Sequence, residues 1–166
     1  MANQIVQELI DKQALTELIF RQALANDQRD WKTYRECMAD GDVHFDFTDH
    51  TDRVIGKHVG VVTSSDSWVA KVTAVNLGFD ATQHIISNLI HVVRAEEADS
   101  ECFTVAEHFL NNSIGDRSIT MGGIFKIQSV RTPSGWKIKR WHLAVLWYRG
   151  NPAIYRLAQE RAAAVE

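Results

Sequence analysis

The chain has few of the residues that mark a specialised class of protein. Its 166 residues include two cysteines, Cys37 and Cys102, and only two prolines. The cysteines lie far apart in the sequence and belong to no Cys-x-x-Cys or Cys/His cluster, so they do not form a disulfide framework of the kind that small secreted domains use. We therefore expect two reduced thiols in an intracellular protein.

Long apolar runs and an excess of one charge are also missing. No segment approaches the roughly 18 consecutive apolar residues of a membrane-spanning helix. Met1–Gln7 has neither the basic nor the apolar part of a secretion signal. The net charge is −3 and no basic stripe is present, which argues against nucleic acid as a partner. These absences predict a cytoplasmic protein with no nucleic-acid or membrane partner.

The seven histidines do not fall into a metal-binding pattern. The sequence contains no HxH, no HExxH and no carboxylate-flanked histidine spacing. We therefore expect no metal site and no cofactor.

Hydrophobic periodicity divides the chain into helices followed by strands. Apolar residues recur at helical spacing from Ile5 to Ala25, and Asp30 can cap a second helix from Trp31 to Met38. Further helices are expected at Val61–Asn76 and from Pro152 to about Ala164, with a polar loop at Thr48–Gly60. The expected strands are Val43–Phe47, Thr82–Val93, Glu101–Asn111, Ser118–Val130 and Trp136–Tyr148.

This order of elements predicts an α+β fold, because the helices precede a meander of four long strands. The chain has no repeat and no linker, so we expect one domain over residues 1–166. The simplest packing is one curved, mostly antiparallel sheet wrapped around the N-terminal helices, with a pocket between them.

Strand alternation indicates which side chains face this pocket. It places Asn88 and Ile90 on the same face as His84 and turns His91 away. The expected lining is apolar and aromatic, which suits a small hydrophobic ligand that contains rings. The residues expected to contact such a ligand are Phe47, Asn88, Met121, Phe125, Trp141, Leu143, Val145 and Trp147.

Asp27 and His84 are the candidate proton-transfer pair. Asp27 ends the first long helix, and His84 lies within the apolar stretch Thr82–Asn88. Imidazole moves protons near neutral pH better than any other side chain. If the fold joins the two, the carboxylate fixes the ring tautomer and the other ring nitrogen becomes a general base. The alternatives are a turn residue for Asp27 and a buried structural histidine for His84.

Several segments resemble the NTF2-like superfamily, in its SnoaL-like and scytalone dehydratase-like branch. Asn26–Trp31 resembles the Asp-x-x-Asp-Trp helix junction, and Thr82-Gln83-His84 resembles the Thr-Gln-His motif. Ala106-Glu107-His108 falls at the second pocket histidine, and Gly135–Ile138 resembles the final strand. The resemblance covers about Leu15–Leu157. It implies a cone-shaped α+β barrel in which Asp27 orients His84 as the base and His108 binds or protonates the leaving oxygen.

The chain departs from scytalone dehydratase at the positions that hold the substrate carbonyl. Asn26 and Phe47 stand where that enzyme has two tyrosines, and Met121 and Gly123 stand where it has a Ser/Asn pair. The resemblance therefore implies a related lyase, or an isomerase of the ketosteroid isomerase type, without fixing the bond broken. It also leaves open a non-catalytic ligand binder or a structural subunit like the β subunit of ring-hydroxylating dioxygenases. A homodimer or homotrimer is expected from the same resemblance.

Overall fold

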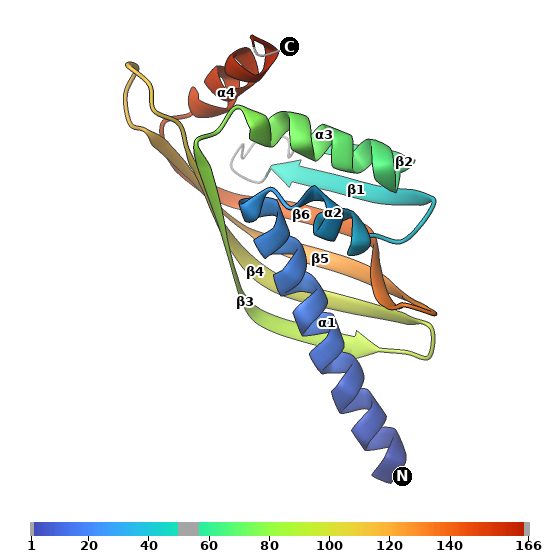
Figure 1. Cartoon of the computed structure of the whole chain (residues 1–166). Coiled ribbons are helices and arrows are strands. Elements are labelled where there is room, and N and C mark those ends of the chain that lie inside the picture. Colours follow the sequence, from blue (N-terminus) through green and yellow to red (C-terminus); the bar gives the residue numbers. More distant parts are fainter. Residues whose placement is uncertain (1, 50–56, 165–166) are drawn as a thin grey trace.

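The computed structural model describes residues 2–49 and 57–164, and its elements follow the predicted order (Figure 1). Four helices and six strands form an α+β fold with a curved, mostly antiparallel sheet, as the sequence predicts. The elements are α1 (Ala2–Gln28), α2 (Trp31–Glu36), β1 (Asp42–Asp49), β2 (Lys57–Ser64), α3 (Ser65–Leu77), β3 (Ala81–Val93), β4 (Glu97–Phe109), β5 (Ser118–Thr132), β6 (Gly135–Gly150) and α4 (Ile154–Ala163).

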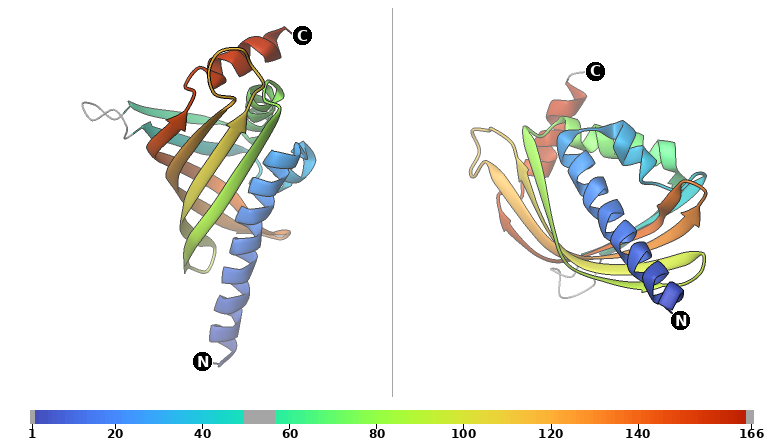
Figure 2. Two further views of the ribbon diagram at one scale, coloured as in Figure 1. Left: turned by 90° about the vertical axis from the view of Figure 1, so that its left-hand side faces the viewer. Right: turned by 60° about the horizontal axis from the view of Figure 1, so that its bottom comes forward.

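The six strands form one sheet in the order β2-β1-β6-β5-β4-β3. All neighbours are antiparallel except β1 and β6, which pair in parallel from His44–Arg140 to Asp49–Val145. The sheet curves around α1, which crosses its concave face, while α3 runs alongside (Figure 2). This curvature creates the hollow in which the candidate site lies.

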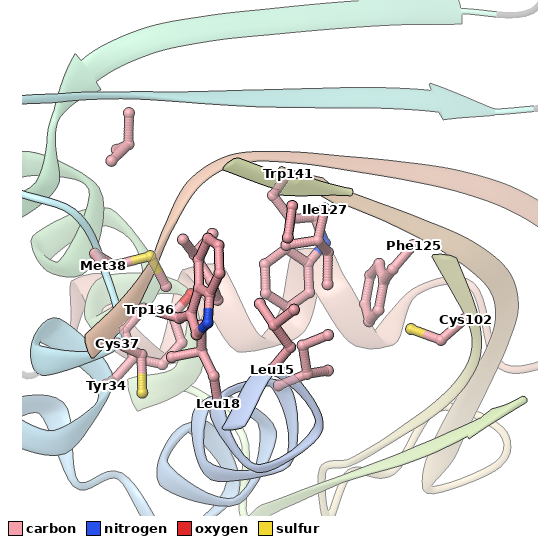
Figure 3. Packing of buried hydrophobic residues seen from close by; sticks show 14 of the residues in the cluster. Leu15, Leu18, Tyr34, Cys37, Met38, Cys102, Phe125, Ile127, Trp136 and Trp141 are labelled. Carbon is pink, nitrogen blue, oxygen red and sulfur yellow. The ribbon is translucent and has the colours of Figure 1, made fainter. Parts of the chain in front are cut away.

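The main core fills the concave face between α1 and the sheet (Figure 3). Leu15 and Ile19 of α1 are fully buried, and they belong to one cluster with Phe125, Ile127 and Trp141 of the sheet. Full burial of each such side chain contributes about 1.5–3 kcal/mol. Cys37 and Cys102, the two free thiols, are buried in the same cluster.

The apolar face of α1 is shorter than its periodicity predicts. Ile5 and Leu9 are each 61 % exposed, and burial begins at Asp11 and Leu15. The reason is that the N-terminal turns of α1 extend beyond the edge of the sheet (Figure 1). None of the described helices is long and apolar enough to cross a membrane.

The predicted loop at 48–60 and the predicted helix start at Val61 are wrong. β2 runs from Lys57 to Ser64 and pairs with β1, so that Val61 lies opposite Phe45 and Val59 opposite Phe47. The β-branched residues at 59 and 61–63 suit a strand better than a loop or helix. α3 begins only after Ser64, whose hydroxyl accepts a hydrogen bond from the Ser67 amide at 3.2 Å. Residues 50–56 of the predicted loop lie outside the described residues.

A β-bulge in β3 reverses the predicted faces after Ser87. Asn88 and Leu89 together lie opposite Cys102, because pairing resumes only at Ile90 with Glu101. Ile90 is therefore 69 % exposed, whereas the prediction placed it inside. His91 turns inward instead, and its ring nitrogens contact the hydroxyls of Thr16 and Ser100.

A second bulge in β6 has the same effect on the predicted lining. Gly122 pairs with Trp147 and Gly123 with Val145, which leaves Leu146 as the extra residue. Trp147 consequently faces outward, covers Gly122 on the convex side and is 43 % exposed. Tyr148 takes the inward direction in its place.

α4 closes one end of the concave face. Ile154 and Ala158 pack against Phe79, Leu110 and Ile119 in a separate small core. Gly78 lies so close to α4 that a Cβ on it would stand 1.9 Å from the Ala158 carbonyl oxygen. This close approach positions the side chains of α4 relative to β4 and β5.

Candidate active site

The structure joins Asp27 and His84 at the junction of α1 and β3. Oδ1 of Asp27 lies 2.7 Å from Nδ1 of His84, and Oδ2 accepts the His84 backbone N–H at 2.7 Å. The Thr82 hydroxyl donates to Oδ1 at 2.9 Å. The two side chains are only 14 % and 16 % exposed. A single carboxylate thus fixes both the backbone and the ring of His84.

The electrostatics favour an ionised Asp27 and an Nδ1–H tautomer of His84. Burial alone would raise the pKa of Asp27, but its hydrogen bonds to His84 and Thr82 and its charge interaction with His84 lower the pKa below the usual range. An ionised carboxylate only accepts hydrogen bonds, so the ring must donate from Nδ1. The lone pair of His84 Nε2 is then available as a base.

His108 lies close to His84 on the inner face of β4. The ring centroids are 5.9 Å apart and the planes are nearly perpendicular. Burial, and after it the neighbouring charge of His84, lowers the pKa of His108 to about 4. His108 is therefore neutral near pH 7 and is suited to donate a ring N–H rather than to carry a charge.

The two histidines open into an apolar cavity of about 560 Å³. Ligand pockets of about 300–1,000 Å³ hold drug-sized molecules. One wall contains Phe45 stacked on Trp68, with ring centroids 3.4 Å apart. Five residues expected as ligand contacts lie in the lining: Phe47, Met121, Phe125, Trp141 and Leu143.

Three other expected contacts lie outside this lining. Asn88 is exposed at the β3 bulge, and Trp147 faces outward after the β6 bulge. Val145 does face inward, but it is fully buried against Ala106 and Met121 beneath the cavity wall. Sequence periodicity places the two bulged positions wrongly because a single extra residue reverses every side chain after it.

Sequence reasoning missed most of the other polar groups in the lining, since the resemblance named only Asn26 beside the two histidines. Gln22 and Asn26, one turn apart on α1, line the cavity together with Asn76 of α3. Their helical spacing gives a weak signal, because amides on the inner face of an otherwise apolar helix need hydrogen-bond partners. Tyr148 of β6 and Tyr155 of α4 also line the cavity. No local sequence pattern reveals them, because a bulge turns Tyr148 inward and α4 reaches the site only through the tertiary fold.

The asparagine pair retains unused hydrogen-bonding capacity. Nδ2 of Asn76 donates to the Val72 carbonyl at 2.9 Å and approaches Oδ1 of Asn26 at 3.5 Å. Within the described part of the chain, Nδ2 of Asn26 and Oδ1 of Asn76 have no hydrogen-bond partner. Both residues are 7 % exposed. Because both side chains line the cavity, this pair is suited to bind a neutral oxygen of a ligand.

The described part of the chain shows no arrangement of side chains for a resident metal ion. No group of three or more His, Cys, Asp or Glu side chains within residues 2–49 and 57–164 is placed to hold one. The chemistry that the described groups themselves can perform is proton transfer between a histidine base and a histidine donor across an apolar cavity.

A family model describing a SnoaL-like domain matches residues 7–142. The chain belongs to the SnoaL-like domain family. A curated relative of this SnoaL-like chain is the terrestric acid biosynthesis cluster protein E of Penicillium crustosum. It is 21 % identical over 153 residues, which cover 89 % of this chain and 90 % of that protein.

Solved structures share the fold of this SnoaL-like domain. The Kfla4162 protein of Kribbella flavida superposes with a TM-score of 0.79 at 21 % identity, covering 90 % of this chain and 99 % of that one. A candidate scytalone dehydratase of Novosphingobium aromaticivorans gives 0.70 at 16 % identity, covering 91 % and 92 %. A type 2 hexachlorocyclohexane dehydrochlorinase gives 0.68 at 15 % identity, covering 88 % and 92 %. These likenesses establish the NTF2-like fold with neighbours of the dehydratase and dehydrochlorinase kind.

Proposed function

We propose that the protein is a cofactor-independent lyase that eliminates a leaving group from a small hydrophobic, ring-containing substrate. The observation that carries this proposal is the double contact between Asp27 and His84 at the wall of an apolar cavity. A pocket that only bound a ligand would need no such anchored base. The neighbouring folds of dehydratase and dehydrochlorinase type support the same reaction class.

The proposed reaction is a proton abstraction followed by loss of an oxygen leaving group. His84 Nε2 removes a proton from the carbon next to an activating carbonyl, and Asp27 stabilises the imidazolium that forms. The electron pair of the broken C–H bond forms the new double bond as the C–O bond breaks. His108 donates its ring proton to the departing oxygen, so that a β-hydroxy ketone yields an enone and water, and transfer of the abstracted proton from His84 to His108 then restores both rings. General acid–base catalysis of this kind contributes about 10²–10⁴-fold.

The cavity favours a neutral substrate. No Lys or Arg occurs among the described residues that line it, so nothing there compensates a substrate anion. The polar groups of the lining include the two histidines, Tyr155, Asn26 and Asn76. An aromatic or polycyclic compound that carries oxygen atoms fits this lining.

Hydrogen–deuterium exchange tests the proposal without knowledge of the leaving group. A panel of cyclic and aromatic ketones is incubated with the protein in D₂O, and exchange of the proton next to the carbonyl is followed by NMR. We expect exchange with the natural sequence and loss of it in His84→Ala. The panel includes β-hydroxy ketones, on which formation of an enone is followed by its ultraviolet absorbance. Absence of exchange and elimination across the panel would count against the lyase assignment.

The second candidate is a non-catalytic subunit, for which the outer face of the sheet supplies a contact surface. Ile85, Phe103 and Trp147 are exposed there although they are large and apolar. Such a surface marks a protein contact. We propose that this face mediates a homodimer or homotrimer of the enzyme, which light scattering during gel filtration tests. A heteromeric contact combined with an inactive pocket would instead favour the subunit role.

The deuterium-exchange experiment also tests the isomerase alternative. Deuterium exchange next to the carbonyl without formation of an enone would favour an isomerase.

A further inference from the structure

We infer that Tyr155 fixes the tautomer of His108, so that the two pocket histidines carry their ring protons on opposite nitrogens. The inference rests on the proposed lyase function for its chemical use, but its geometry is independent of any substrate. Tyr155 is a positioning residue in this scheme, because it acts on the substrate only through His108.

Tyr155 reaches His108 from the C-terminal helix. Its hydroxyl oxygen lies 3.4 Å from Nδ1 of His108, and the ring centroids are 5.1 Å apart. Phe79 packs edge-on against Tyr155 and also contacts the His108 ring. One turn after Tyr155, the close approach of Gly78 to Ala158 holds α4 in place. The phenol is thus fixed from two sides and is not a mobile surface group.

The proton of this contact belongs to Tyr155. Burial raises the pKa of Tyr155, so the phenol keeps its proton and needs an acceptor. Within the described residues, the contact recorded for this hydroxyl is His108 Nδ1. The His108 ring also hydrogen-bonds to the backbone of Ile119, which raises the pKa of His108 and therefore accepts a ring N–H. If that N–H were on Nδ1, the phenol proton would have no described acceptor. With the lone pair on Nδ1, the contact is satisfied and the proton of His108 resides on Nε2.

His84 has the opposite arrangement. Its Nδ1 faces the carboxylate of Asp27, which can only accept, so the proton resides on Nδ1 and the lone pair on Nε2. A hydrogen-bond acceptor therefore anchors one histidine and a donor anchors the other. The two Nε2 atoms thus take the roles of a base and an acid. This division suits an elimination, which removes a proton at one atom and delivers one at another.

Nitrogen NMR tests the inference on the protein without a ligand. Long-range ¹H–¹⁵N spectra distinguish protonated from unprotonated ring nitrogens, and spectra of His84→Asn and His108→Asn assign the two rings. We expect an unprotonated Nδ1 in His108 and a protonated Nδ1 in His84. In Tyr155→Phe, the His108 Nδ1 signal should shift downfield toward that of a nitrogen without a hydrogen bond. Tyr148→Phe removes a second cavity phenol and should leave this signal in place.

A protonated Nδ1 in His108 of the natural sequence would overturn the inference, as would an unchanged Nδ1 signal in Tyr155→Phe. The first outcome requires no variant, so the inference remains testable if Tyr155→Phe does not fold. Neither outcome affects deuterium exchange by His84, so a failure here is distinct from a failure of the proposed function. Once a substrate is known, Tyr155→Phe should lower kcat by about 10-fold or more with little change in KM.

Discussion

Both carboxylate oxygens of Asp27 bind the same residue, one accepting the backbone N–H of His84 and the other its ring Nδ1, each at 2.7 Å. The contact joins the end of α1 to the start of β3, which are distant in the sequence. It ties the orientation of the ring to the position of the strand itself. A base held in this way loses little freedom when a substrate arrives, which is the advantage of a preorganised site.

Asp27→Asn should abolish most proton abstraction. The amide keeps the size of the side chain but can present an N–H to His84, which favours the wrong ring tautomer. We expect deuterium exchange to fall at least about 100-fold. Loss of the charged acceptor should also cost about 1–3 kcal/mol of stability, measured by urea unfolding. Thr82→Val serves as the control, because it removes one hydrogen bond to Asp27 and leaves the ring contact intact.

Burial of His108 should make the protein less stable in acid. The pKa of His108 is lowered from 6.5 to about 4, so the unfolded state takes up a proton in this range while the native state does not. The stabilisation is complete above about pH 6.5 and is lost as the pH falls toward 4, by up to about 3 kcal/mol. Urea unfolding at several pH values measures it. His108→Gln should show a correspondingly flatter decline, and an equal decline in both proteins would contradict the assignment.

Gly78→Ala should displace α4. The added Cβ would stand 1.9 Å from the Ala158 carbonyl oxygen, which is backbone and cannot rotate away. We expect a clear loss of melting temperature and loss of the Tyr155 contact to His108 in the NMR spectrum. Tyr155→Phe is the control, because it removes the hydroxyl but keeps the ring packed on Phe79. A Gly78→Ala protein with an unchanged melting temperature would show that α4 is not held by this contact.

Asn26 should select oxygenated ligands. Naphthol and its hydrocarbon counterpart methylnaphthalene differ in the hydroxyl, and tryptophan fluorescence reports their binding because Trp68 and Trp141 line the cavity. We expect naphthol to bind about 10-fold more tightly than the hydrocarbon, from one hydrogen bond to a buried amide. Asn26→Leu should remove this preference. If the preference persists in Asn26→Leu, the hydroxyl is bound elsewhere.

Asn88 should be replaceable without effect on ligand binding. It is exposed at the β3 bulge, where its φ of 58° lies in the left-handed region. Asn88→Gly should be neutral or slightly stabilising, whereas Asn88→Val should cost roughly 1–2 kcal/mol because a β-branched residue is strained there. Thermal unfolding measures both. A change in naphthol affinity in Asn88→Gly would show that this residue contacts the ligand, as the sequence predicted.

The sequence predicted the α+β class, the four long strands and the first long helix, which ends at Gln28 beside Asp27. Asp30 caps α2 as expected, with the Thr33 amide donating to its carboxylate at 3.0 Å. These features depend on short-range spacing, capping and alternation, which a sequence displays directly. The joining of Asp27, His84 and His108 came only from the family resemblance, since no local pattern links segments so far apart.

The sequence by itself determined which residues are apolar and which side chains share a face along an uninterrupted strand. The tertiary structure decided where those strands are interrupted. The bulges at Asn88 and Leu146 place Asn88 and Trp147 outside the cavity and bring Tyr148 into it. The tertiary structure also decided that Tyr155 of the last helix lies against His108. The physical reason is that a bulge and a helix docking are fixed by partner strands and packing surfaces distant in the sequence, whereas alternation and periodicity depend only on near neighbours.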